Sequence, residues 1–218
     1  MYPRQVIAIV GQSGCGKTTL AQLIAGNFRP TKGISYDGHD GDFISHQSLR
    51  RQIGFVMQTH HLFQVSIGDN IAYADDAPSQ KRIAKVANQA HVAPFVTVLP
   101  AGYSTVLGEG GTGLSGGQAQ RLSLARTLYR DPRILILDEA TSELDADSEQ
   151  SIVENMHELV RGRTSIIIAH RLSTIRRADV IFVMKEGEIV EEGNHEQLIS
   201  SRGHYAELFA GQLTEFEN

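Results

Sequence analysis

Residues 6–18 read VIAIVGQSGCGKT, and this stretch decides the fold. The apolar run at residues 6–10 predicts a strand that is buried on both faces in a parallel sheet. The residues from Gly11 to Thr18 match the pattern G-x-x-x-x-G-K-[ST], and a helix is expected from Gly16. Strand, glycine-rich loop and helix in this order turn backbone N–H groups and the positive end of a helix toward a phosphate. The sequence therefore predicts a phosphate loop.

Within this loop, Lys17 is expected to reach the β- and γ-phosphates of a nucleotide and to serve catalysis, and Thr18 is placed to ligate Mg²⁺. Such a loop alone fits kinases, GTPases and many other nucleotide enzymes. The residues predicted here to bind the nucleotide are Gly11, Gln12, Ser13, Gly14, Cys15, Gly16, Lys17, Thr18 and Thr19.

Short apolar runs recur along the chain, at residues 53–57, 134–137, 165–169 and 180–184, with helical patterns between several of them. This alternation predicts an α/β fold with a mostly parallel sheet. Residues 71–130 lack a convincing strand, and Ser79 is a candidate N-cap before apolar residues at helical spacing. We therefore predict one domain over residues 1–218, with a core at about 1–70 and 131–218 and an inserted α-helical subdomain at about 71–130.

The last fifty residues carry two local patterns. Two apolar pairs at residues 183–184 and 189–190 flank Lys185-Glu186-Gly187-Glu188, which predicts a hairpin. A terminal helix is expected to follow, with an apolar stripe that we predict to be core. That stripe consists of Tyr205, Leu208, Phe209, Leu213 and Phe216.

The composition narrows the class of protein. The chain has 218 residues, enough for one sizeable core, and a net charge of -5 without a Lys/Arg-rich run, so nucleic acid is not an expected ligand. Its apolar runs are far shorter than the ~20 residues of a membrane-spanning helix.

The single cysteine, Cys15, excludes an intrachain disulfide, and no charged and apolar leader precedes Val6. A reducing, cytosolic location is expected.

Two carboxylates follow the apolar run at residues 134–137, Asp138 and Glu139. They fall at the carboxyl end of a predicted buried strand, where open α/β sheets bind their ligands. Asp138 is expected to hold Mg²⁺, and Glu139 to orient and polarise the attacking water. The two residues together predict hydrolysis of the bound nucleotide.

A second glycine pair lies in the string Leu114-Ser115-Gly116-Gly117-Gln118, which is expected to open a helix from about Gly117 to Leu128. With the phosphate loop and the acidic strand, this string resembles the nucleotide-binding domain of an ATP-binding cassette (ABC) transporter, and the resemblance runs from Val6 to the C-terminal helix. It implies that Ser115 and Gly117 contact the γ-phosphate of an ATP held by a second subunit, and that Gly116 and Gln118 also belong to the ATP-binding residues. Physically, another helix N-terminus would offer N–H groups to a phosphate.

The resemblance extends to three other residues. Gln58, after the run at residues 53–57, is similar to the glutamine that senses Mg²⁺ and the water in this family, which implies a role in ATP and metal binding. Asp145 matches the segment that crosses the dimer interface and is implied to be an ATP-binding residue, although Glu143 stands where the family often has alanine. His170 resembles the switch histidine that contacts the γ-phosphate and implies a catalytic role. The implied metal ligands are Thr18, Gln58 and Asp138.

Two segments favour exporters over importers. Residues 105–111, with Glu109 at the acidic position, and residues 169–174 resemble exporter segments, including those of peptide and protein exporters, type I secretion, and multidrug or lipid exporters. The implied function is hydrolysis of Mg-ATP at a head-to-tail dimer interface to power export. The implied partners are a second nucleotide-binding domain, identical or different, and the transmembrane domain of an exporter, at the cytoplasmic face of the membrane.

The sequence before the phosphate loop has room for one strand only. In the family, antiparallel strands and an aromatic residue that stacks on adenine lie upstream, and Tyr2 is too close to the loop to replace the aromatic. The antiparallel β subdomain is therefore expected to be incomplete, with a lone strand at about residues 33–36. Either the chain is a fragment of a longer polypeptide or it is an unusually short subunit.

Two motifs are interpreted as structural. Residues 37–42 read DGHDGD, which lacks the spacing of a calcium loop and predicts a turn. His60 and His61 have no cysteine or acidic ligand at metal spacing, so they are interpreted as surface for a partner.

Two alternative functions stay open. A non-transport ABC ATPase acting on chromosomes or ribosomes would be expected to show a coiled-coil insertion, tandem cassettes or basic surfaces. A non-catalytic regulatory fragment fits the short start, but Glu139 and His170 are both present. Co-purification with membranes would test the first alternative, and phosphate release would test the second.

Overall fold

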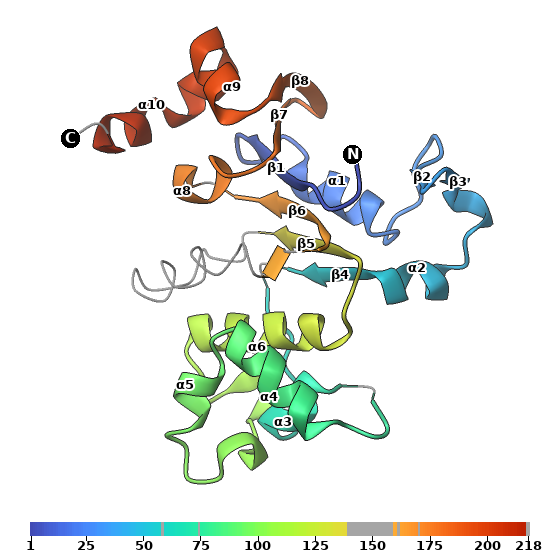
Figure 1. The fold of residues 1–218 in the computed structure, drawn as a ribbon, viewed down its shortest axis with the longest axis vertical. Coiled ribbons are helices and arrows are strands. Elements are labelled where there is room, and N and C mark those ends of the chain that lie inside the picture. Colours follow the sequence, from blue (N-terminus) through green and yellow to red (C-terminus); the bar gives the residue numbers. More distant parts are fainter. Residues whose placement is uncertain (58, 74, 139–158, 161, 170, 217–218) are drawn as a thin grey trace. The chain divides into compact units, whose positions relative to one another are not determined.

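The computed structural model describes residues 1–57, 59–73, 75–138, 159–160, 162–169 and 171–216, with side-chain surroundings up to residue 212. The chain forms two compact units (Figure 1). Unit 1 comprises Met1–Phe55, Arg133–Glu139 and Gly162–Asn218, and unit 2 comprises Val56–Pro132 and Ala140–Arg161. The predicted single-domain organisation stays a prediction, and each unit is described by itself.

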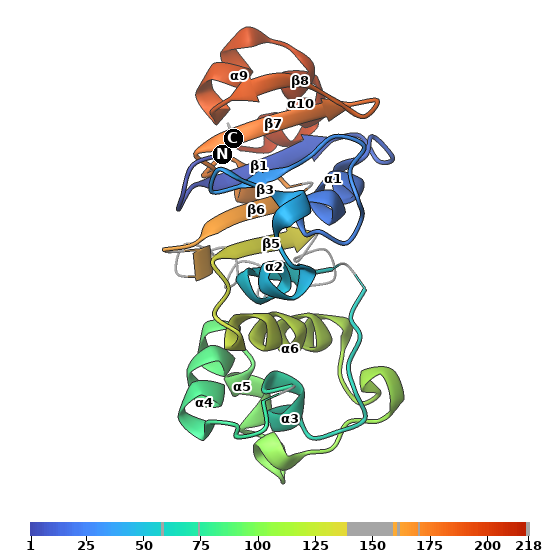
Figure 2. The same ribbon diagram turned by 90° about the vertical axis from the view of Figure 1, so that its right-hand side faces the viewer.

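Unit 1 is built on a six-stranded sheet with the order β4-β5-β6-β1-β7-β8, several strands of which lie side by side in Figure 2. The pairs β5–β6, β6–β1 and β1–β7 are parallel, and β7–β8 is antiparallel. The predicted mostly parallel sheet and the predicted C-terminal hairpin are therefore confirmed. The strands are β1 Val6–Gly11, β4 Ile53–Val56, β5 Ile134–Asp138, β6 Thr164–Ile168, β7 Val180–Lys185 and β8 Glu188–Gly193.

The centre of the sheet carries the core of unit 1. Strand β1 is flanked by β6 and β7, so Ile7 and Ile9 are buried, as its unbroken apolar run predicts. Helix α1, Lys17–Ile24, packs against β1, β5 and β6 through Ala21 and Ile24. Helix α2, His46–Gln52, adds Leu49 to the same cluster. Burial of these side chains fixes the end of β1, and with it the loop that follows.

The small antiparallel sheet corrects one expectation. The strand near residues 33–36 was expected to lack a partner, but β2, Ser35–Tyr36, pairs with β3, His39–Asp40. Asp37 and Gly38 join them with φ values of 50° and 79°. A two-residue turn with two positive φ angles fits the twist of a hairpin, and Asp-Gly is a favoured sequence for it. The predicted turn at residues 37–42 is thus the connection that supplies the partner strand.

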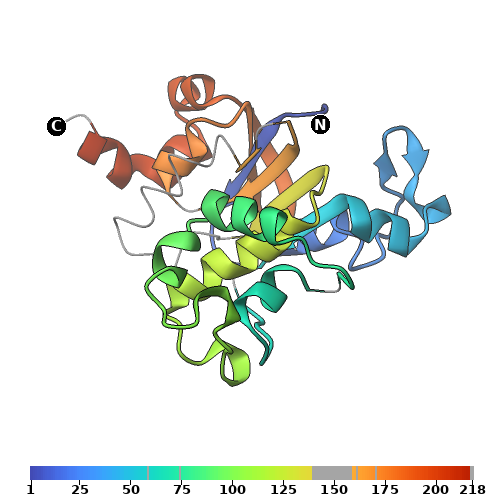
Figure 3. The same ribbon diagram turned by 60° about the horizontal axis from the view of Figure 1, so that its bottom comes forward.

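Unit 2 is predominantly helical in its described residues, and Figure 3 brings its helices forward. Helix α6 packs against α3 and α4, as the predicted helical subdomain requires. Ser79 caps α4 as expected, since its hydroxyl accepts a hydrogen bond from the backbone N–H of Arg82. The elements are α3 Ile67–Ile71, α4 Gln80–Gln89, α5 Ala93–Val96, α6 Gly116–Tyr129, and the short 3₁₀ helices η2 Gly102–Ser104 and η3 Glu109–Gly111.

In the described part of unit 1, three helices follow β6: α8 Leu172–Ile175, α9 His195–Ser201 and α10 His204–Phe216. Tyr205 and Phe209 of the predicted stripe are buried and Leu208 is half-buried, whereas the side chains of Leu213 and Phe216 lie outside the described part. Among the described residues, the structure contains no helix with the length and apolar character required to cross a bilayer.

Candidate functional site

The phosphate loop begins where β1 meets β7. Gly11 is paired with Met184, and a Cβ atom at Gly11 would lie 2.3 Å from the Met184 carbonyl oxygen and 2.7 Å from the Cys15 Sγ atom. No side chain fits there, so glycine is required at this position. The chain then leaves the sheet, and α1 starts at Lys17 after Gly16 in the left-handed conformation. Strand, loop and helix therefore follow the predicted order.

Lys17 lies inside the loop and is only 6% exposed. Its ammonium Nζ donates to the carbonyl oxygens of Gly11 and Gln12, each at 3.0 Å. The backbone N–H of Cys15 also donates to the Gln12 oxygen, at 3.2 Å, which tightens the turn around the ammonium. The two carbonyl oxygens stabilise the buried ammonium, and phosphate oxygens could replace them as its hydrogen-bond partners.

The outer rim of the loop is open. Gln12, Ser13 and Gly14 are exposed, and so are Thr18 and Thr19 at the start of α1. The hydroxyl of Thr18 therefore has room for a ligand beside the buried ammonium. This arrangement, a buried cation behind exposed backbone at a helix N-terminus, suits the binding of a polyphosphate.

Asp138 ends β5 and is 5% exposed. It is level with Ile168 of β6, and β6 pairs in parallel with both β5 and β1. Parallel strands end at the same edge of a sheet, so Asp138 and Gly11 lie at one edge with β6 between them. The topology thus brings the predicted metal-binding carboxylate and the phosphate loop to the same side of unit 1.

The string at residues 114–118 opens α6 in unit 2. The Ser115 hydroxyl accepts from the backbone N–H of Gln118 at 3.3 Å, and the Gln118 side chain accepts from the Ser115 N–H at 2.9 Å. This capping box makes Ser115 the N-cap, so the helix begins at Gly116, one residue before the predicted start. Ser115 and Gly116 are exposed, while Gly117 and Gln118 are half-buried.

Two segments of unit 2, residues 62–67 and 105–111, are joined by backbone hydrogen bonds. The Leu107 N–H donates to the Val65 oxygen at 3.1 Å, and the Ile67 N–H donates to the Thr105 oxygen at 2.9 Å. Glu109 is exposed on η3. A Cβ at Gly111, where φ is +88°, would lie 2.8 Å from the Leu62 Cδ1 atom, so the close approach of the two segments requires glycine.

The two loop histidines differ in exposure. His61 is exposed as expected, but His60 is half-buried and both of its ring nitrogens are shielded from solvent. The interpretation of both histidines as surface for a partner stays a prediction. In the described part of the chain, no group of three or more His, Cys, Asp or Glu residues is arranged to hold a metal ion.

Four predicted site residues, Gln58, Glu139, Asp145 and His170, lie outside the described residues, so their roles stay predictions. Glu143 does as well.

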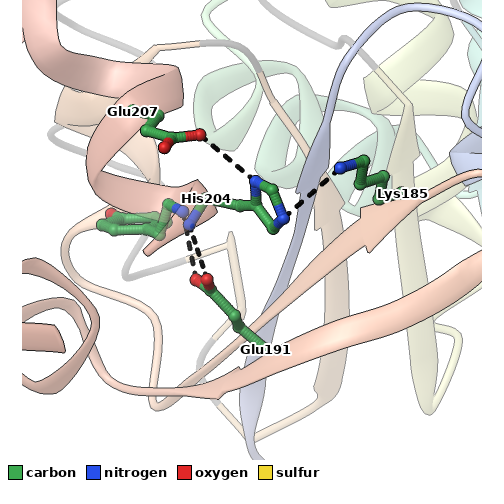
Figure 4. A network of polar contacts seen from close by, with 5 residues as sticks. Lys185, Glu191, His204 and Glu207 are labelled. Carbon is green, nitrogen blue, oxygen red and sulfur yellow. Dashed lines mark hydrogen bonds and ion pairs between the residues drawn. The ribbon is translucent and has the colours of Figure 1, made fainter. Parts of the chain in front are cut away.

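A cavity of about 550 Å³ lies beside the phosphate loop in unit 1, between residues 12–15, the end of β7 and α10. Figure 4 shows the polar contacts near it. The Glu191 carboxylate accepts from the backbone N–H groups of His204 and Tyr205, at 2.6 and 3.0 Å, and so caps α10. The His204 ring contacts Glu207 at 3.2 Å and Lys185 at 3.5 Å. Sequence reasoning missed this cap because Glu191 and α10 are linked only by the fold.

Tyr205 is held from its other side by His195. Burial raises the pKa of the Tyr205 hydroxyl and lowers the pKa of the His195 imidazole. The Tyr205 hydroxyl and His195 Nδ1 lie 2.9 Å apart and share a hydrogen bond. This bond joins α10 to α9.

The model of the family described as ABC transporter matches residues 1–142. This chain belongs to the ABC transporter family. The match confirms the predicted family, and with it the prediction of a nucleotide-binding domain. The observed mixture of a mostly parallel sheet, a helical part and a small antiparallel sheet confirms the predicted fold class.

Two curated relatives are named for lipid flipping and for secretion. The chain is 51% identical over 212 residues to an ATP-dependent lipid A-core flippase of Syntrophus aciditrophicus, covering 97% of this chain and 35% of the flippase. It is 49% identical over 214 residues to the cyclolysin secretion/processing ATP-binding protein of Bordetella pertussis, covering 98% of this chain and 30% of that protein. The chain thus spans about a third of the length of these relatives.

A solved structure of an ABC exporter is similar to this chain. The structure of a bacterial Atm1-family ABC exporter with ATP bound matches with a TM-score of 0.92 and 44% sequence identity. The match covers 96% of this chain and 37% of the exporter chain.

Proposed function

We propose that this chain is the ATPase module of an ABC exporter and hydrolyses Mg-ATP at the interface of a head-to-tail dimer. The observation that carries the proposal is the phosphate loop, in which the buried Lys17 ammonium lies behind the exposed residues Gln12, Ser13 and Gly14. On binding ATP, Lys17 would exchange the carbonyls of Gly11 and Gln12 for oxygens of the β- and γ-phosphates.

The oxygen donors near the loop fit a magnesium ion. Thr18 offers an exposed hydroxyl beside Lys17, and Asp138 offers a buried carboxylate at the same sheet edge. Hydroxyl and carboxylate oxygens are the ligands that Mg²⁺ takes in nucleotide sites. We assign Thr18, Asp138 and Gln58 as the residues that would hold the ion. Bound there, Mg²⁺ would neutralise charge on the phosphate oxygens.

The remaining roles come from the family resemblance and complete the site. Glu139 positions the attacking water and accepts its proton, and His170 contacts the γ-phosphate. The second subunit supplies Ser115 and Gly117, for which the exposed start of α6 is the supporting observation. Gly116 and Gln118 shape that helix start, and Asp145 links the two sites across the interface.

The names of the relatives, a lipid A-core flippase and a cyclolysin secretion/processing ATP-binding protein, support a role in export. The partners in this proposal are a second nucleotide-binding domain and the transmembrane domain of an exporter, with this chain at the cytoplasmic face of the membrane. Residues 58–70 and 105–111 would face that membrane domain, and the hydrogen bonds between residues 65–67 and 105–107 and the exposed Glu109 support this.

The hydrolysis step is tested with Glu139→Gln, measured beside the matched variant Glu143→Gln four residues further on. ATP binding to each variant is measured by equilibrium dialysis, and turnover by phosphate release. Glu139→Gln is expected to bind ATP like the wild type and to lose at least about 100-fold in turnover, the scale of a positioned general base. Glu143→Gln is expected to keep both. Unchanged turnover in Glu139→Gln would refute its role.

A further inference from the structure

Arg126, near the end of α6, donates hydrogen bonds to a segment that lies far from it in sequence. Its Nε donates to the Asn70 backbone oxygen at 2.8 Å, and its Nη1 donates to the His61 backbone oxygen at 2.6 Å. Its Nη2 donates to the Asn70 side-chain oxygen Oδ1. The guanidinium therefore spans both ends of residues 61–70, a segment that we call the clamp segment.

Asn70 adds hydrogen bonds within the clamp segment. It is fully buried, its Oδ1 accepts from the Phe63 N–H at 3.0 Å, and its Nδ2 donates to the oxygens of Phe63 and Ser66, at 2.9 and 3.1 Å. Buried amide groups with this many backbone partners hold a loop in one conformation. Arg126 thus binds a residue that itself fixes the path of the clamp segment.

The guanidinium also contacts an exposed aromatic pair. The rings of Phe63 and Tyr73 stack with their centroids 4.1 Å apart and their planes at 9°. The Arg126 Cζ lies 5.0 Å from the Phe63 centroid and 5.8 Å from the Tyr73 centroid, within cation–π range of both. Phe63 is 39% exposed and Tyr73 44% exposed. The stacked pair therefore keeps apolar surface in solvent next to residues 61–70, which the proposed function places against a membrane domain.

The same helix carries the predicted ATP contact at its other end. Ser115 caps the start of α6, and Arg126 lies eleven positions later, about 16 Å along the axis of one uninterrupted helix. Backbone hydrogen bonds join each turn of a helix to the next, so a displacement of one end of α6 is carried to the other. A shift of Ser115 would therefore displace Arg126 and whatever Arg126 holds.

We propose that Arg126 is a positioning residue that ties the clamp segment and the Phe63–Tyr73 pair to α6, so that closure of Ser115 on ATP moves this partner-facing surface. The inference rests on the proposed function, because it requires ATP to engage Ser115. Arginine is needed for its planar fork, which reaches two carbonyls and an amide oxygen while lying against two rings. Lysine is a single point charge and would keep only part of these contacts.

Hydrogen exchange of the whole chain, with and without Mg-ATP, tests this inference in Arg126→Lys. The matched control is Arg121→Lys, on the same helix and also half-buried, with its Cζ 5.7 Å from the ring centroid of Phe95. In the wild type and the control, ATP is expected to slow exchange at residues 115–119 and to change exchange at residues 61–66. Arg126→Lys is expected to keep the first response and lose the second, with basal ATPase within about twofold of the wild type and exchange at 61–66 faster by at least about tenfold.

The outcomes separate the inference from the proposed function. If ATP changes residues 115–119 but residues 61–66 respond equally in the wild type and Arg126→Lys, the positioning role is wrong while the ATP site stands. If ATP leaves residues 115–119 unchanged in the wild type, the shared site and the inference fail together. Should Arg126→Lys not fold, Phe63→Leu provides a second test because it alters an exposed ring that Arg126 contacts. In this variant, the ATP-dependent change in hydrogen exchange at residues 61–66 is expected to fall to about half or less of the wild-type change. An unaltered change would overturn the inference.

Discussion

Two capping boxes in this chain allow the proposed role of Ser115 to be separated from its effect on stability. In α6, Ser115 accepts from the Gln118 N–H at 3.3 Å and Gln118 returns a bond to the Ser115 N–H at 2.9 Å. In α9, Asn194 accepts from the Gln197 N–H at 2.9 Å and Gln197 returns one at 3.0 Å. Asn194→Ala is thus the matched control for Ser115→Ala.

The two variants are expected to lose similar stability. Each removes a side-chain acceptor from the first turn of a helix, which costs about 1 kcal/mol in the free energy of unfolding. In a chain of this size, that loss lowers the midpoint of thermal unfolding by about 2–4 °C. Thermal unfolding followed by circular dichroism measures this shift for both.

The ATPase rates should differ. Ser115→Ala also removes the hydroxyl proposed to contact the γ-phosphate, and a hydrogen bond to a charged group contributes about 1.5–3 kcal/mol. The rate at saturating ATP is therefore expected to fall by about 10- to 150-fold, while Asn194→Ala keeps the wild-type rate. Phosphate release is measured at one high chain concentration and at 20 °C, where both variants are folded. Equal rates in the two variants would refute the reasoning.

Three other changes have defined outcomes. Lys17→Met removes the buried ammonium and is expected to weaken ATP binding by at least about 100-fold by equilibrium dialysis; wild-type affinity would contradict the phosphate-loop assignment. Glu191→Ala removes both caps of α10 and is expected to cost about 1–2 kcal/mol and to speed hydrogen exchange at residues 204–208; unchanged exchange there would show that the cap contributes nothing. The hydrogen bond from Tyr129 lowers the pKa of Asp75, so its stabilising effect is present above the ordinary carboxyl pKa and is lost as the pH falls through the lowered value. The urea midpoint of the wild type should therefore exceed that of Asp75→Asn at about pH 7, and the two midpoints should converge as the pH is lowered to about 2. A difference that stays constant over this range would be inconsistent with this linkage.

Local patterns in the sequence predicted much of this fold. The strand before the phosphate loop was predictable because β1 is flanked on both sides, and a central parallel strand needs an unbroken apolar run. Gly11 was predictable as part of a motif, and the structure adds the reason, the close approach of the Met184 carbonyl. The cap of α4 by Ser79 was equally local.

Features that depend on distant parts of the chain were not predictable. The Asp37-Gly38 turn is visible in the sequence, but its pairing of β2 with β3 depends on two very short strands with little pattern of their own. Arg126 and Asn70 lie 56 residues apart, and no periodicity links them. An arginine near the end of a helix is commonly a solvated residue favoured by the helix dipole. In this fold, Arg126 instead donates hydrogen bonds to the backbone of His61 and Asn70.

Complementation between two inactive variants tests the shared site most directly. Lys17→Met disables the phosphate loop, and Gly117→Asp places a carboxylate in the first turn of α6, where it suits the helix but repels a phosphate. Each variant alone is expected to be inactive. In an equal mixture, half of the dimers are mixed and each has one complete site, so about a quarter of the wild-type Mg-ATPase rate should return. A mixture that stays inactive at concentrations where the wild type is active would contradict a site built from two subunits.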